Sequence, residues 1–197
     1  MNTTLVIPGL HGSGPAHWQT WFESTVADCR RVEQPDWGLP SLPHWAACVG
    51  DHLRAAARPV WIVAHSFGCL AAVAAAQREP GHVLGALLVA PADPRRFGVS
   101  AETIGKSLPF PSLVIASEND PWLGLDSAAA LAAGWRSGWV NIGRAGHINV
   151  DSGFGPWPEG VGFFSNLRRG ARPSPGSGTA ARLRLSNNDG DSHAALV

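Results

Sequence analysis

The chain has 197 residues, of which 45% are hydrophobic and only 15% charged. This balance favours one soluble globular domain and excludes bulk disorder. Fifteen basic residues balance fifteen acidic ones, so we expect no binding to nucleic acid or to an anionic membrane surface. No apolar run approaches the roughly 20 residues of a membrane span, and we expect neither a signal peptide nor a membrane segment. Three scattered cysteines without a Cys-x-x-Cys motif favour reduced thiols, which predicts a cytoplasmic protein.

Apolar runs that are typical of buried parallel strands alternate with helical patterns along most of the chain. In chain order, the pattern predicts a strand over residues 5–7, a helix over 16–27, an edge strand over 31–34, a helix over 42–57, a strand over 59–64, a helix over 67–78, strands over 83–89 and 113–116, a helix over 127–135, a strand over 139–142 and a helix over 159–169. Strands that alternate with helices predict an α/β fold in which a mostly parallel central sheet is covered by helices on both faces. Ligands of such sheets bind at the carboxyl ends of the strands.

The composition changes near residue 170. Beyond it, proline, glycine, serine and asparagine dominate, and this composition cannot bury enough apolar surface to offset the entropy lost on ordering. We therefore expect residues 1–170 to form the folded domain and residues 171–197 to form a flexible tail.

One serine lies where an expected strand meets the Ala-rich helix that follows it, in the context Ala64-His65-Ser66-Phe67-Gly68. A sharp strand-to-helix turn needs small residues two positions before and after the serine, and here these are Ala64 and Gly68. The turn exposes the Ser66 hydroxyl and directs the Phe67 N–H to the place where an oxyanion would form. Ser66 is the predicted nucleophile; the alternative is that it only caps the helix.

A serine hydroxyl attacks efficiently only when a base takes its proton and an acid orients that base. Asp120 follows an expected strand and is the predicted acid, with Glu118 as the local alternative. His147 lies in a Gly-bracketed loop after the last expected strand and is the predicted base. The order Ser, Asp, His is the chain order of enzymes built on this type of turn.

The glycine-rich loop after the first strand, residues 8–15, is the second part of the predicted site. Its backbone can turn an N–H group toward Ser66, and a second donor would complete an oxyanion hole. The Leu10 N–H is the preferred donor, and the His11 N–H is the alternative. The Gly-Lys-Ser/Thr ending of a nucleotide-binding loop is absent. His11 and Trp122 are candidate contacts for the substrate.

Two other chemistries are disfavoured. Cys48 and Arg54 have the spacing of a cysteine-dependent phosphatase, but they lie in an expected helix rather than in a phosphate-binding loop. The eight histidines are scattered and form no metal-binding motif, so we expect no metal and no cofactor. Asp151 could support His147, although a turn-forming role is favoured.

Together these motifs resemble the compact α/β-hydrolases of the retinoblastoma-binding protein 9 and bacterial YdeN type. The resemblance spans about residues 5–167 and is most specific in its last stretch. The matching segments are Pro8-Gly9, Ser13-Gly14-Pro15, His17-Trp18-Gln19, Gln34-Pro35-Asp36-Trp37, Ala64-His65-Ser66-Phe67-Gly68, Asn119-Asp120-Pro121, Ala145-Gly146-His147-Ile148-Asn149, Asp151-Ser152-Gly153 and Gly155-x-Trp157-Pro158-Glu159-Gly160.

The resemblance implies a three-layer α/β-hydrolase fold without a large lid and a Ser66–Asp120–His147 triad. It also implies hydrolysis of carboxylic-ester or related acyl bonds in a small-molecule substrate. Ala64 departs from the glycine of the wider superfamily. The Leu-x-Cys-x-Glu segment on which the human relative's retinoblastoma contact depends is absent, so that partner is not expected. A binding protein on the same scaffold, with an unused triad, is the alternative function.

Overall fold

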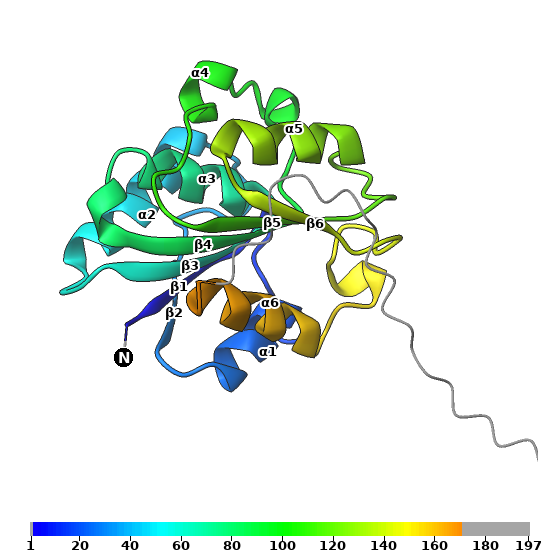
Figure 1. The fold of residues 1–197 in the computed structure, drawn as a ribbon, viewed down its shortest axis with the longest axis horizontal. Helices are drawn as coiled ribbons and strands as arrows, with labels where there is room; N and C mark the ends of the chain where they lie inside the picture. The colour runs from blue at the N-terminus through cyan, green and yellow to red at the C-terminus, as the bar shows by residue number, and fades with distance from the viewer. Residues whose placement is uncertain (1, 171–197) are drawn as a thin grey trace, which may run out of the picture.

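Six parallel strands form the central sheet of the structure, a computed structural model that describes residues 2–170 (Figure 1). Their order across the sheet is β2-β1-β3-β4-β5-β6, and every neighbouring pair is parallel. The strands are β1 (Thr4–Ile7), β2 (Cys29–Arg31), β3 (Val60–His65), β4 (Val83–Val89), β5 (Ser112–Ala116) and β6 (Gly138–Asn141). The predicted α/β architecture is thereby confirmed. The predicted tail, residues 171–197, lies outside the described residues.

Helices cover both faces of the sheet (Figure 1). Two helices, α1 and α6, lie on one face, and α2, α3, α4 and α5 lie on the other. Their bounds are α1 (Trp18–Thr25), α2 (Leu42–Ala55), α3 (Phe67–Ala76), α4 (Ala101–Ile104), α5 (Leu125–Trp135) and α6 (Pro158–Arg168), with 3-10 turns η1 (Pro80–His82), η2 (Pro94–Phe97) and η3 (Val150–Ser152). Between β4 and β5 the chain forms only the short elements η2 and α4, so this part of the chain contains no lid domain.

The edge strand β2 was predicted with the wrong limits. It covers Cys29–Arg31 rather than residues 31–34. The Val32 N–H still donates to the Val6 carbonyl, at 2.9 Å. The next donor that a parallel ladder would require is the N–H of Pro8, and proline has none. Because Pro8 has no N–H, the pairing of β2 with β1 ends earlier than the local sequence pattern predicted.

Side chains of the central strands alternate between two hydrophobic cores because successive strand residues point to opposite faces. On β3, Ile62 and Ala64 belong to the core under α2 and α3, whereas Val63 belongs to the core under α1 and α6. Burial of both sheet faces explains why the central strands are almost entirely apolar in sequence.

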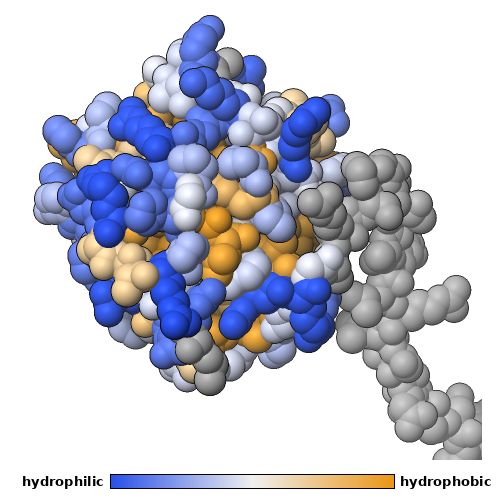
Figure 2. Space-filling model, turned by 60° about the vertical axis from the view of Figure 1, so that its left-hand side comes forward, coloured by the Kyte–Doolittle hydropathy of each residue, from blue (hydrophilic) through white to orange (hydrophobic). Residues whose placement is uncertain are grey.

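The surface seen in Figure 2 is mostly hydrophilic, with a limited hydrophobic patch near its centre.

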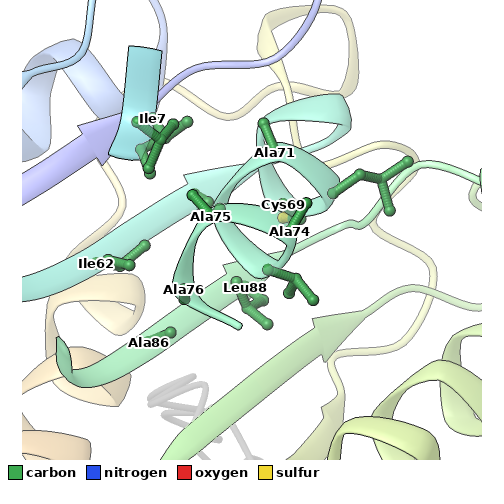
Figure 3. Packing of buried hydrophobic residues seen from close by; sticks show 14 of the residues in the cluster. Ile7, Ile62, Cys69, Ala71, Ala74, Ala75, Ala76, Ala86 and Leu88 are labelled. Carbon is green, nitrogen blue, oxygen red and sulfur yellow. The ribbon is translucent and has the colours of Figure 1, made fainter. Parts of the chain in front are cut away.

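Helix α3 is buried along its whole length, which is rare for a helix of a small domain. Its small side chains share one core with strand residues, as Figure 3 shows for Ala75 and Ala76 near Ile62 and Ala86. At the start of the helix the approach is closest: a Cβ added to Gly68 would lie 2.6 Å from the Ile7 carbonyl oxygen. The alanines and Gly68 thus bring the N-terminus of α3 directly over the ends of β1 and β3.

Candidate active site

Ser66 forms the turn between β3 and α3 and has an unusual backbone conformation. Its φ of 53° and ψ of −126° are unfavourable for a residue with a side chain. The Ser66 N–H donates to the Val89 carbonyl at 3.1 Å, which ties the turn to the end of β4. Gly9 packs against this turn, and a Cβ added to Gly9 would lie 2.7 Å from the Ser66 Cβ. Close packing therefore holds a strained serine at the edge of the sheet, where its side chain is only partly buried.

Three side chains from separate loops form one hydrogen-bonded row. The His147 Nε2 lies 2.8 Å from the Ser66 Oγ, and its Nδ1 lies 3.0 Å from both carboxylate oxygens of Asp120. A carboxylate only accepts, so the Nδ1 carries the hydrogen and the Nε2 is free to accept from the Ser66 hydroxyl. The side chains of His147 and Asp120 are 8% and 3% exposed. The row is thus shielded from solvent behind Ser66.

The acid loop distinguishes the two candidate carboxylates. Asp120 points to His147 and also accepts from the Trp122 N–H at 2.8 Å. The Glu118 carboxylate instead accepts from the side-chain amide of Asn141, at 3.1 Å. Of the two acids, the structure brings Asp120 to the imidazole.

Two polar residues before Asp120 tie its loop to the loop that carries His147. The Ser117 hydroxyl accepts from the Ala145 N–H, and the Asn119 side-chain oxygen accepts from the Gly146 N–H, both at 2.9 Å. The His147 N–H donates to the Ser152 hydroxyl at 3.1 Å. Sequence analysis did not identify these contacts, although the run of polar residues after an apolar strand was a signal for them.

Two backbone N–H groups near Ser66 are candidate oxyanion donors. Within residues 2–170, neither the Leu10 N–H nor the Phe67 N–H has an acceptor. Phe67 is the first residue of α3, where helical N–H groups have no partner in the helix. The His11 N–H donates to the Trp37 carbonyl at 2.9 Å, so it is already engaged. The geometry therefore favours Leu10 over His11.

Of the two candidate substrate contacts, Trp122 lies beside the hydrogen-bonded row of Ser66, His147 and Asp120. His11 forms no hydrogen bond with these three side chains. The Trp122 ring is 43% exposed, and its centroid lies 6.1 Å from that of the His147 ring. The Arg96 guanidinium lies over the Trp122 ring at 5.3 Å and donates to the Pro121 carbonyl at 2.9 Å. Trp122 is thus held at the surface next to the imidazole.

Two further buried histidines, which sequence analysis did not assign to the site, extend inward from His147: His65 lies next to His147, and His17 lies next to His65. The ring centroid of His65 lies 4.9 Å from that of His147 and 5.0 Å from that of His17. Burial, then the charges of Arg31 and His147, lower the pKa of His17 to about 4. Burial is also the main cause that lowers the pKa of His65 well below its ordinary value. Both side chains are therefore neutral near pH 7.

Acidification from pH 7 to pH 4.5 is expected to lower the free energy of unfolding. The unfolded chain protonates His17 near pH 6.5, whereas the folded chain protonates it only near pH 4, so stability is present above about pH 6.5 and is lost as the pH falls. The shift corresponds to about 3 kcal/mol once the full range has been crossed. Urea unfolding at several pH values measures this loss. His17→Asn replaces the accepting Nδ1 with an amide oxygen that can cap α1 but does not titrate, and it should flatten the slope; an equally steep slope in that variant would contradict the assignment.

Within residues 2–170, no group of three or more His, Cys, Asp or Glu side chains is placed to hold a metal ion. In the same part of the chain, no helix combines the length and the apolarity needed to cross a membrane.

The parallel sheet, the serine turn after β3 and the acid and histidine loops after β5 and β6 define an α/β-hydrolase fold. A proposed YdeN-like hydrolase from Pectobacterium atrosepticum has 35% identity, covers 88% of this chain and 94% of its own, and superposes with a TM-score of 0.82. The ydeN gene product of B. subtilis has 20% identity over 86% of this chain and all of its own, with a TM-score of 0.70. Est1E from Butyrivibrio proteoclasticus, solved with ferulic acid, shares the fold at 13% identity over 86% of this chain and 90% of its own, with a TM-score of 0.67.

A family model described as serine hydrolase matches residues 4–166. The chain therefore belongs to this serine hydrolase family, which confirms the resemblance to the YdeN type. No curated protein matches the chain at a significant level.

Proposed function

We propose that this serine hydrolase cleaves small carboxylic esters, or related acyl bonds, through a Ser66–His147–Asp120 triad. The observation that carries the proposal is the continuous row of hydrogen bonds from the Ser66 hydroxyl through the imidazole to the carboxylate. The tautomer of His147 in this row is the one that a general base requires.

In the proposed reaction the Ser66 Oγ attacks the acyl carbonyl carbon while its proton moves to the His147 Nε2. The carbonyl π electrons move to the oxygen, and the resulting oxyanion is stabilised by the Leu10 and Phe67 N–H groups. His147 then gives the proton to the leaving alcohol as the C–O bond breaks. His147 then takes a proton from water while the water oxygen attacks the acyl carbon; the bond from that carbon to the Ser66 Oγ breaks, His147 returns the proton to this oxygen, and the acid is released. Asp120 keeps the imidazole oriented and stabilises the imidazolium.

The surroundings of the row favour small substrates with an apolar or aromatic group. Only η2 and α4 lie between β4 and β5, the segment in which larger α/β-hydrolases carry a lid, and the Ser66 side chain is partly exposed. Trp122 offers an exposed aromatic ring beside the imidazole. We propose Trp122, rather than the triad, as the source of selectivity for aromatic esters.

Replacement of Trp122 by alanine is expected to raise KM for an aryl ester by about 3–10-fold while kcat changes less than about 3-fold. The lost contact is worth about 1 kcal/mol, and it serves substrate and transition state alike. Steady-state kinetics with esters of increasing acyl length measure both constants. Trp139→Ala, which removes an exposed ring on β6, is the matched control and should leave KM unchanged. A fall in kcat with no change of KM in the Trp122 variant would contradict its role in binding.

A fluorophosphonate probe tests the proposed function directly. An activated serine reacts with the probe in a 1:1 ratio, and peptide mapping should locate the adduct on Ser66. Prior denaturation should abolish the labelling, because an isolated serine is a poor nucleophile. If the folded protein is not labelled, the alternative of a binding protein with an unused triad is favoured instead.

A further inference from the structure

Two buried side chains donate hydrogen bonds to successive carbonyls of the loop that carries the imidazole. The His65 Nε2 lies 3.0 Å from the His147 carbonyl oxygen, and the Trp18 Nε1–H donates to the Ile148 carbonyl at 2.9 Å. A carbonyl oxygen only accepts, so the His65 Nε2 carries its hydrogen. His65 is 4% exposed and Trp18 is 1% exposed. Both hydrogen bonds are thus formed in the dry interior, where their loss leaves an unpaired polar group.

The loop held by these donors is strained. Ile148 has a φ of 49°, which is a rare conformation for a β-branched residue and costs on the order of 1–3 kcal/mol. Gly146, on the other side of His147, also has a positive φ, of 56°. A relaxed Ile148 would rotate the peptide after His147 and displace the imidazole from the Ser66 hydroxyl. The two donors oppose this relaxation because each fixes a carbonyl next to the strained bond.

Both donors are anchored to parts of the fold that already position the nucleophile. His65 ends β3 and directly precedes Ser66, so the nucleophile and the support of the base share one stretch of backbone. Trp18 is the first residue of α1, and its ring packs edge-on against Trp157 at 5.3 Å. The His17 side chain caps α1 by accepting from the Gln19 N–H. The positions of β3 and α1 therefore fix the position of the loop that carries His147.

We propose that His65 and Trp18 are positioning residues that keep the His147 imidazole aligned with Ser66 by fixing the backbone after it. The inference rests on the proposed function, in which His147 is the base. Neither side chain hydrogen-bonds to a reacting atom; each acts through a main-chain carbonyl.

The neutrality of His65 is part of this role. The titratable groups that contact the His147 ring are His65 from β3 and Asp120 from the acid loop, and His17, the N-cap of α1, packs on the far side of His65. A charged His65 would oppose the imidazolium that forms on His147 during turnover. A neutral donor supplies the hydrogen bond without that repulsion.

Paired variants test the inference. His65→Met removes the donor, and we expect kcat to fall about 10–100-fold with KM changed less than about 3-fold, because misplacement of a reacting group costs on this order. His65→Gln places an amide N–H near the same position and should recover kcat to within about 3-fold. Trp18→Phe keeps a ring but removes the N–H, and it should lower kcat in the same way.

The double variant His65→Met/Trp18→Phe should lose less than the product of the two single losses, because both donors hold one loop. Unchanged kcat in folded His65→Met would overturn the inference, as would failure of His65→Gln to recover activity. If His65→Met does not fold, Trp18→Phe tests the inference alone: an unchanged kcat in folded Trp18→Phe would overturn it. Ser66→Ala distinguishes failure of the proposed function from failure of the positioning role. If Ser66→Ala retains wild-type activity, the proposed function is wrong. If Ser66→Ala is inactive while the His65 and Trp18 variants are fully active, only the positioning role is wrong.

Discussion

Replacement of Ser66 by alanine is expected to lower kcat for a small aryl ester by about 10⁵-fold or more while the protein stays folded. Removal of the nucleophile from comparable triads costs this order of rate, and the residual rate comes from binding and from the oxyanion donors. The change deletes one partly exposed oxygen and leaves His147 without its hydrogen-bond partner on that side, so unfolding should change little.

The measurement is steady-state hydrolysis, with circular dichroism and thermal unfolding as checks of the fold. Ser24→Ala, at an exposed serine of α1, is a matched control and should retain the wild-type rate. Hydrolysis by folded Ser66→Ala at more than about a tenth of the wild-type rate would show that another group is the nucleophile.

Asp120→Asn should lower kcat by about 10⁴-fold at neutral pH, the second largest effect expected for this chain. The asparagine amide can donate to the His147 Nδ1, and this favours the tautomer whose Nε2 carries the hydrogen. An Nε2 that already carries a hydrogen cannot accept the Ser66 proton. Steady-state kcat and the rate of fluorophosphonate labelling should both report the loss.

Glu118→Gln is the matched control for the acid. Its carboxylate accepts from Asn141 rather than from the imidazole, and glutamine keeps an accepting oxygen, so kcat should change less than about 3-fold. If Glu118→Gln loses more activity than Asp120→Asn, the assignment of the acid is wrong and Glu118 takes its place.

The positions of the three side chains follow from the topology of the sheet. Ser66, Asp120 and His147 follow β3, β5 and β6, which run in the same direction and end at the same edge. The close approach of Gly68 to the end of β1 brings the first loop to that edge as well. The candidate donors and the proposed triad thus come from loops that share one edge of the sheet, which is the usual place of ligand binding in such folds.

Local sequence determined the strand and helix pattern and the elements that carry the candidate site. Continuous apolar runs predicted the central strands, because both faces of the sheet are buried. Small residues at positions 64 and 68 predicted the serine turn, because larger ones would not fit its geometry. The order of Ser66, Asp120 and His147 predicted a row that the structure brings together with hydrogen bonds of 2.8 and 3.0 Å.

Only the tertiary structure decided which neighbouring residues reach the site. It directs Asp120 rather than Glu118 to the imidazole, and it engages the His11 N–H with Trp37 while leaving the Leu10 N–H without an acceptor in residues 2–170. It also ended β2 at Arg31. Each outcome depends on a partner far along the chain, which local pattern does not encode.

The contacts around the loop that carries His147 illustrate the same limit most clearly. Trp18 has the sequence pattern of a packing residue, yet its N–H reaches the carbonyl of Ile148, 130 positions away. Periodicity and composition describe how a segment folds against a generic core. The direction of one buried donor is set by the packing of whole elements, and this emerges only when α1, β3 and the last loop meet in space.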